Sequence, residues 1–148
     1  MSLLDRLFET VFIPPEVRDE ILVVDNSVRG IAAIRGAFAA DMIEVLSLTG
    51  SGSAPNVHPS LHRGEVAAIT LMQEVSADFL LLDDRQARGD AERLGMSVIG
   101  TIGVLQLARD ADVIPAVAPL VRMLRGFGFR VSAELLAQVE QDEQLHRP

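Results

Sequence analysis

The stretch FLLLDDRQAR, from Phe79 to Arg88, places four apolar residues directly before two aspartates and an arginine. Four consecutive apolar residues are typical of a strand that is buried on both faces, as in the parallel sheets of α/β proteins. Ligands of such proteins bind outside the carboxyl ends of the strands. Asp83 and Asp84 are therefore expected where an open α/β sheet carries its chemistry. The alternative is that Asp84 only caps the following helix, because Asp is a favoured N-cap residue.

The rest of the chain alternates between strand-like and helix-like patterns. Short strands are expected at residues 10–13, 42–48, 77–84 and 96–100. Helices are expected from Pro15 onward and at residues 29–42, 61–75, 85–95, 101–114, 118–129 and 132–145. We expect Gly95 and Thr101 to act as a C-cap and an N-cap, respectively. Strands that alternate with helices in this way predict an α/β fold with a mostly parallel sheet.

Composition narrows the class of protein. The 148 residues, 49% of them hydrophobic, are enough for one domain with a buried core. The absence of cysteine excludes a disulfide framework and a thiolate metal site. No apolar run has the length of a membrane span, and the start MSLLDRLFET lacks the pattern of a signal peptide. The expected location is therefore the cytoplasm, with no membrane partner.

The net charge of -8 opposes nonspecific binding of nucleic acids. Contact with RNA or DNA would have to be local, through an arginine cluster or through divalent cations held by carboxylates. Arg85, Arg88 and Arg93 follow the aspartate pair and offer such a cluster. The alternative is that these arginines form an ordinary solvated helix face.

Carboxylates are the side chains that could carry chemistry in this sequence. It has no phosphate-binding loop, and its three histidines are not spaced as a metal site. Glu65 begins a predicted helix, and helix N-termini meet strand C-termini at one edge of a parallel sheet, so Glu65, Asp83 and Asp84 can converge. Oxygen ligands of this kind suit Mg²⁺ or Mn²⁺. The alternative for Glu65 is a first-turn acid that the helix dipole favours.

The segment from His62 to Ile114 resembles the PIN-like nuclease superfamily, and in particular a group of short prokaryotic proteins predicted to bind nucleic acids. The features that carry the resemblance are Gly64–Glu65 at a helix start, the strand ending LLLDD, Arg85 and Arg88 in an Arg-x-x-Arg pattern, and the GTIGVL of Gly100 to Leu105. Weaker similarity extends over nearly the whole chain. The expected organisation is a single PIN-like domain over residues 1–148.

The resemblance implies a three-layer α/β/α sandwich and a metal-dependent ribonuclease site. By motif match, Glu65 and Asp84 are the catalytic acids that bind Mg²⁺ or Mn²⁺, and Asp83 is a neighbouring acid that assists or shares the ion. Arg85 or Arg88 would meet the RNA phosphate, water would be the nucleophile, and the products would carry 5′-phosphates. Because the wider family includes toxins of toxin–antitoxin pairs, an antitoxin protein is a candidate partner.

The chain departs from the family pattern at its start. Members of the family begin with a strand of the form V-V-x-D-T-S, which carries the first acid of the site, followed by a helix. Here SLLDRLF matches only the end of that helix, so the first strand, its Asp and part of the first helix are expected to be missing. The stretch ILVVDNS, from Ile21 to Ser27, would supply Asp25 in the vacant role, although it follows the second strand.

Two further interpretations stay open beside an active nuclease. A degenerate PIN-like domain that no longer cleaves would act as an RNA-binding, protein-binding or dimerisation module, which the missing Asp and the acidic net charge favour. A carboxylate-based phosphatase would also use LLLDD, but the sequence offers no second Asp two residues later and no distal Lys. The high apolar content with few aromatic residues favours a homodimer.

Overall fold

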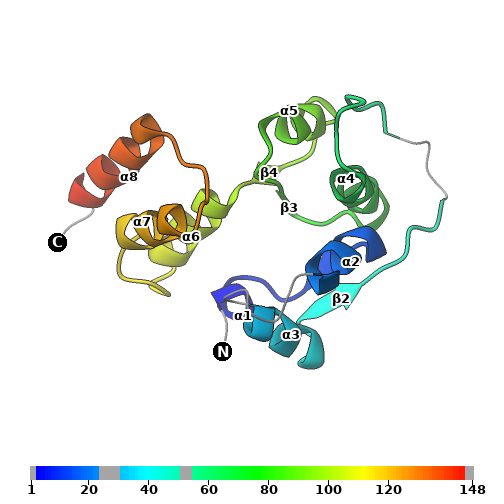
Figure 1. Ribbon diagram of the computed structural model, residues 1–148, viewed down its shortest axis with the longest axis horizontal. Helices are drawn as coiled ribbons and strands as arrows, with labels where there is room; N and C mark the ends of the chain where they lie inside the picture. Colours follow the sequence, from blue (N-terminus) through cyan, green and yellow to red (C-terminus); the bar gives the residue numbers. More distant parts are fainter. Residues whose placement is uncertain (1–2, 24–30, 51–54, 146–148) are drawn as a thin grey trace. The chain divides into compact units, whose positions relative to one another are not determined.

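The computed structural model describes residues 3–23, 31–50 and 55–145. The chain folds as two compact units, Met1–Thr101 and Ile102–Pro148. The helices of the first unit are α1 (Leu3–Leu7), α2 (Pro15–Val23), α3 (Ile31–Ala39), α4 (Arg63–Val75) and α5 (Arg85–Arg93). Its strands are β1 (Val11–Ile13), β2 (Ile43–Val45), β3 (Leu80–Leu81) and β4 (Val98–Ile99). The other helices are α6 (Thr101–Asp110), α7 (Ala118–Gly126) and α8 (Ala133–Leu145). Figure 1 follows these elements along the chain.

The described strands pair in parallel, which confirms the predicted α/β class. β1 pairs with β2, with Val11 opposite Ile43, and β3 pairs with β4, with Leu80 opposite Val98. Within the described residues these pairs form two separate two-stranded sheets, where the sequence predicted one central sheet. The three-layer arrangement therefore stays a prediction.

The core of the first unit lies where β3 meets α4 and α5, which Figure 1 shows in green. Ile69 of α4 is fully buried, and Ala87 and Ala91 of α5 are also inaccessible to solvent. Together with Leu80 and Leu82 they form one hydrophobic cluster. The two alanines are four residues apart, so they lie on the same face of α5, and their small side chains allow the helix to approach β3 closely.

The prediction that the β3 segment is buried on both faces was wrong. Leu80 and Leu82 are 7% and 6% exposed, whereas Phe79 and Leu81 are 49% and 52% exposed. Successive side chains of a strand point to opposite faces, and the hydrophobic cluster with α4 and α5 takes up only the face of Leu80 and Leu82. An unbroken apolar run is thus compatible with a strand that is covered on one side.

Two helix caps were predicted, one after the last turn of α5 and one at the start of α6. Gly95 has a φ of +82°, and the amide of Met96 donates to the Ala91 carbonyl at 3.0 Å, so Gly95 is the left-handed residue that closes α5, as predicted. Thr101 is instead the first residue of α6, and its hydroxyl donates to Asp83 at 2.6 Å. The predicted helix start is correct, but this hydroxyl donates to a carboxylate in the segment after β3 and does not cap its own helix.

The second unit contains a pair of packed helices, α7 and α8. Val121 of α7 and Val139 of α8 are buried, and Glu143 of α8 accepts a hydrogen bond from the Ala118 amide at 2.7 Å, at the start of α7. α7 is followed by Gly128 with a φ of +92°. Ser132, where the sequence predicted the start of the last helix, caps α8 by accepting from the Leu135 amide at 3.1 Å. In the parts of the chain that the structure describes, no helix is long and apolar enough to cross a membrane.

Candidate functional site

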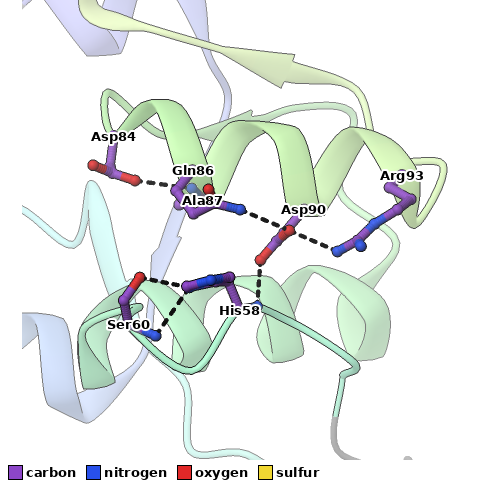
Figure 2. Close-up of polar contacts among 7 residues, drawn as sticks. All are labelled: His58, Ser60, Asp84, Gln86, Ala87, Asp90 and Arg93. Carbon is purple, nitrogen blue, oxygen red and sulfur yellow. Dashed lines mark hydrogen bonds and ion pairs between the residues drawn. The ribbon is translucent and has the colours of Figure 1, made fainter.

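Asp84 lies three residues after β3 and is the N-cap of α5. Its backbone is extended (φ −65°, ψ 130°), and its Oδ1 accepts a hydrogen bond from the Ala87 amide at 2.9 Å (Figure 2). The capping interpretation of Asp84 is therefore confirmed. Its other oxygen, Oδ2, has no hydrogen bond to a described residue. Asp84 is exposed, so this second oxygen can bind a ligand while the first one caps the helix.

Asp83 connects the end of β3 to the segment after β4. Its Oδ1 accepts from the Thr101 amide at 2.8 Å, and its Oδ2 accepts from the Thr101 hydroxyl at 2.6 Å. Both carboxylate oxygens therefore bond one residue, the last residue of the first unit. This arrangement makes Asp83 a brace between the ends of two paired strands.

Glu65 is the third residue of α4 and also belongs to a helix start. Its Oε2 accepts a hydrogen bond from the His62 amide at 2.9 Å, and its Oε1 has no hydrogen bond within the described ranges. Near it lies an acid that the sequence patterns did not predict, Glu20 of α2. A Cβ atom at Gly64 would lie 2.9 Å from Oε1 of Glu20, so this carboxylate packs against the first turn of α4. Glu20 is exposed on a polar helix, and nothing in its spacing indicates this contact.

Arg85 and Arg88 occupy different environments on α5. Arg85 is exposed at the first position of the helix, and Arg88 is half-buried one turn later. A Cβ atom at Gly100 would lie 2.7 Å from Nη1 of Arg88, so this guanidinium lies against the backbone at the end of β4. Arg93, the third member of the predicted cluster, pairs with Asp90 at 2.6 Å.

Asp90 is the buried acid of this region, with 3% of its surface exposed. Its Oδ2 accepts from the His58 amide at 2.5 Å, and its Oδ1 accepts from Arg93 at 2.6 Å and from Gln86 at 3.3 Å. Figure 2 shows these bonds joining α5 to the loop that precedes α4. In that loop the ring Nδ1 of His58 contacts the Ser60 hydroxyl at 2.7 Å, which is a contact within one turn. Asp90 thus holds the loop leading to Glu65 against the helix that begins after Asp84.

The spacing of residues in α5 is a signal for the burial of Asp90. Ala87, Asp90 and Ala91 are spaced three and four residues apart, so they share one face of α5, and all three are buried. A single acid on the apolar face of a helix predicts a buried carboxylate with hydrogen-bond partners.

Residues 1–144 match the model of the DUF3368 family, which is described as a PIN domain. The chain belongs to this PIN domain family. The match extends over both compact units, so it includes the elements around Glu65, Asp83 and Asp84 as well as α7 and most of α8. Comparison with curated proteins and comparison with solved structures gave no match.

Within residues 3–23, 31–50 and 55–145, the acids of this PIN domain do not form a complete metal site. Among the residues that the structure describes, no three His, Asp or Glu side chains are grouped so that they could hold a metal ion. Mg²⁺ in proteins is commonly bound by one or two carboxylates and keeps several waters. Glu65 and Asp84 each retain one carboxylate oxygen without a hydrogen bond to a described residue, and such donors suit this ion. The donor chemistry therefore fits a hard divalent cation bound by few protein ligands.

Asp25, the candidate for the missing first acid, lies outside the described residues. The structure does describe the beginning of the ILVVDNS stretch, because α2 continues through Val23. Ile21 to Val23 are therefore helical, and the strand that we considered for this stretch does not begin there. Ile21 and Val23 are β-favouring residues, yet both lie at the end of a helix, which shows how weak such a short pattern is.

Proposed function

We propose that this PIN domain is a divalent-metal-dependent ribonuclease in which Glu65 and Asp84 are the catalytic acids. The observation that carries the proposal is the position of Asp84, at the carboxyl end of a parallel strand, with one oxygen capping α5 and the other without a hydrogen bond to a described residue. Ligands of α/β proteins bind at this edge of the sheet. Family membership supports nuclease chemistry at this edge.

In this proposal, Glu65 and Asp84 hold Mg²⁺ or Mn²⁺ through their second oxygens. The bound ion would lower the pKa of a water molecule and neutralise charge on the phosphodiester. Asp83 would assist as a neighbouring acid, chiefly by bracing the end of β3 through its two bonds to Thr101. A cation from α5, Arg85 or Arg88, would bind the RNA phosphate. Hydrolysis with water as the nucleophile would leave 5′-phosphates.

Replacement of Asp84 by Asn separates catalysis from helix capping. Asn is as good an N-cap as Asp, so Asp84→Asn keeps the bond to Ala87 and removes only the charge. We expect cleavage of single-stranded RNA in Mn²⁺ to fall about 100-fold or more, the scale of one lost catalytic group. Asp78→Asn is the matched control, because Asp78 is an exposed acid just before β3. Full activity of Asp84→Asn would refute the proposal.

A second candidate function is a PIN-like module that binds RNA or a protein partner without cleaving. Two observations favour it: Thr101 bonds both oxygens of Asp83, and the described residues contain no three-acid group. This candidate predicts RNA binding that does not change when EDTA replaces Mn²⁺, and no cleavage products from either the wild-type protein or Asp84→Asn.

Organisation and partners are further parts of the proposal. We propose that the two compact units form one domain with a three-layer α/β/α arrangement, which the family match over residues 1–144 supports. We also propose a cytoplasmic homodimer that pairs with an antitoxin protein. Size-exclusion chromatography with light scattering tests the dimer, because a monomer at working concentration would exclude it.

A further inference from the structure

We infer that Arg88, rather than Arg85, receives the RNA phosphate, and that Gly100 positions Arg88 for this contact. The inference rests on the proposed function and sharpens it, because the family match and the motif leave the two arginines equivalent. The structure separates them by burial and by their neighbours.

Gly100 leaves the space that the Arg88 side chain uses. It is a buried residue directly after β4, and a Cβ atom built on it would lie 2.7 Å from Nη1 of Arg88 and 3.1 Å from Oδ1 of Asp83. Real Cβ atoms essentially never approach another heavy atom within 3.0 Å, so even alanine at position 100 is incompatible with this position of Arg88. Gly100 is thus a positioning residue that acts through Arg88.

The guanidinium of Arg88 also has no ion-pair partner in the described part of the chain, although the Asp83 carboxylate lies on the same side of Gly100. Arg88 is half-buried, yet its side chain makes no hydrogen bond with the residues that the structure describes. Partial removal of a guanidinium from water is unfavourable unless an anion or hydrogen-bond acceptor compensates. Its nitrogens are not among the fully buried atoms without a partner, so a ligand can reach them. A bound oxyanion would supply the missing acceptor.

The other two arginines of α5 do not share these properties. Arg93 pairs with the buried carboxylate of Asp90. Arg85 is exposed and keeps its hydration, so a phosphate contact there would add little more than a screened surface interaction. Arg88 is the one that lies beside Gly100 and Asp83, at the ends of the paired strands β4 and β3. A guanidinium binds two oxygens of a phosphodiester through parallel hydrogen bonds, which makes RNA backbone the expected ligand.

The test is binding of a labelled single-stranded RNA oligonucleotide, measured by fluorescence anisotropy in EDTA at several salt concentrations. Arg88→Ala is expected to weaken binding about tenfold, the scale of one charge-assisted hydrogen bond. It should also reduce the slope of log affinity against log salt by about 0.7. Gly100→Ala should reproduce both changes, because the new methyl group displaces the flexible end of Arg88. The double variant should bind no more weakly than Arg88→Ala alone.

Two control variants isolate the effect. Gly89→Ala adds the same methyl group next to Arg88 on α5, but it meets nothing within 4 Å, so RNA binding should not change. Arg85→Ala removes an exposed charge from the same helix and should change affinity less than Arg88→Ala. Gly100→Ala should remain folded, because the nearest atom is the end of a flexible side chain. Thermal unfolding of each variant checks this.

The outcomes distinguish this inference from the proposed function. Wild-type protein that binds no RNA overturns both. RNA binding that Arg85→Ala lowers and Arg88→Ala leaves unchanged overturns the inference alone. A second readout needs no RNA: the NMR signal of the Arg88 Nε–H group should shift in Gly100→Ala and stay in place in Gly89→Ala. An unshifted signal in Gly100→Ala would remove the positioning role of Gly100.

Discussion

The two parallel strand pairs of the first unit have similar lengths and similar apolar sequences, but they differ in how they are covered. In the pair β3–β4, Leu80 and the adjoining Leu82 are buried in a cluster with α4 and α5. In the pair β1–β2, no residue is buried, and Phe12 is 37% exposed. The flanking helices, and not the strand residues themselves, account for the difference. The candidate site lies at the end of β3. One face of this segment is held in place by its packing against α4 and α5.

The largest expected effect is a loss of stability, which we compare between Ile69 of α4, beside β3, and Ile13 of β1. Ile69 is fully buried in the cluster beside β3, so Ile69→Ala should lower the free energy of unfolding by about 3 kcal/mol through lost burial and a cavity. Ile13 of β1 is half-buried, and Ile13→Ala should cost only about 1 kcal/mol. Urea denaturation measures both values. Equal losses of unfolding free energy would show that the surroundings of the two strand pairs contribute equally to stability.

Asp90 gives the next largest effect. Asp90→Ala should lower the free energy of unfolding by about 2 kcal/mol, because the His58 amide loses its acceptor. The matched control is Asp19→Ala, which removes an exposed ion pair with Arg18 and should change stability by less than about 0.5 kcal/mol. The same denaturation experiment compares the two variants. A loss for Asp90→Ala as small as that of the control would contradict the role of Asp90 as a clamp.

A smaller effect is expected at the start of α5. Asp84→Ala should lower the free energy of unfolding by about 1 kcal/mol through loss of the N-cap, whereas Asp84→Asn should be close to neutral. Both variants should lose RNA cleavage. Denaturation and cleavage assays on the same preparations test this, and a cleaving Asp84→Asn variant would show that Asp84 is only a cap.

The smallest expected effect is a change in the pKa of Glu134. This residue lies in α8, outside both strand pairs, and serves as a reference. Hydrogen bonds from its own backbone amide and from the Ser132 hydroxyl lower the pKa of Glu134 below its ordinary value of 4.5. A lowered pKa means that the ionised form contributes stability above the unfolded-state pKa, and that this contribution disappears as the pH falls through the folded-state pKa. Ser132→Ala should raise the pKa of Glu134 toward 4.5 in an NMR titration. An unchanged pKa would show that the hydroxyl has no effect.

Local patterns predicted the elements that position the site. The apolar run before Asp83, the helical spacing after Glu65 and the glycine at position 95 depend on neighbouring residues, and the structure has β3, α4 and the end of α5 there. The exposed face of Phe79 and Leu81 and the clamp between Asp90 and His58 could not be predicted in this way. Both depend on which distant element packs nearby, and hydrophobic periodicity contains no information on that.

Calorimetric titration of Mn²⁺ into the wild-type protein and into Asp84→Asn tests the central claim most directly. If Glu65 and Asp84 hold the ion, the wild-type protein should bind Mn²⁺ with measurable heat, and Asp84→Asn should lose this binding while it unfolds at the same temperature. Absence of binding in both proteins, or equal binding in both, would contradict a metal site at the end of β3.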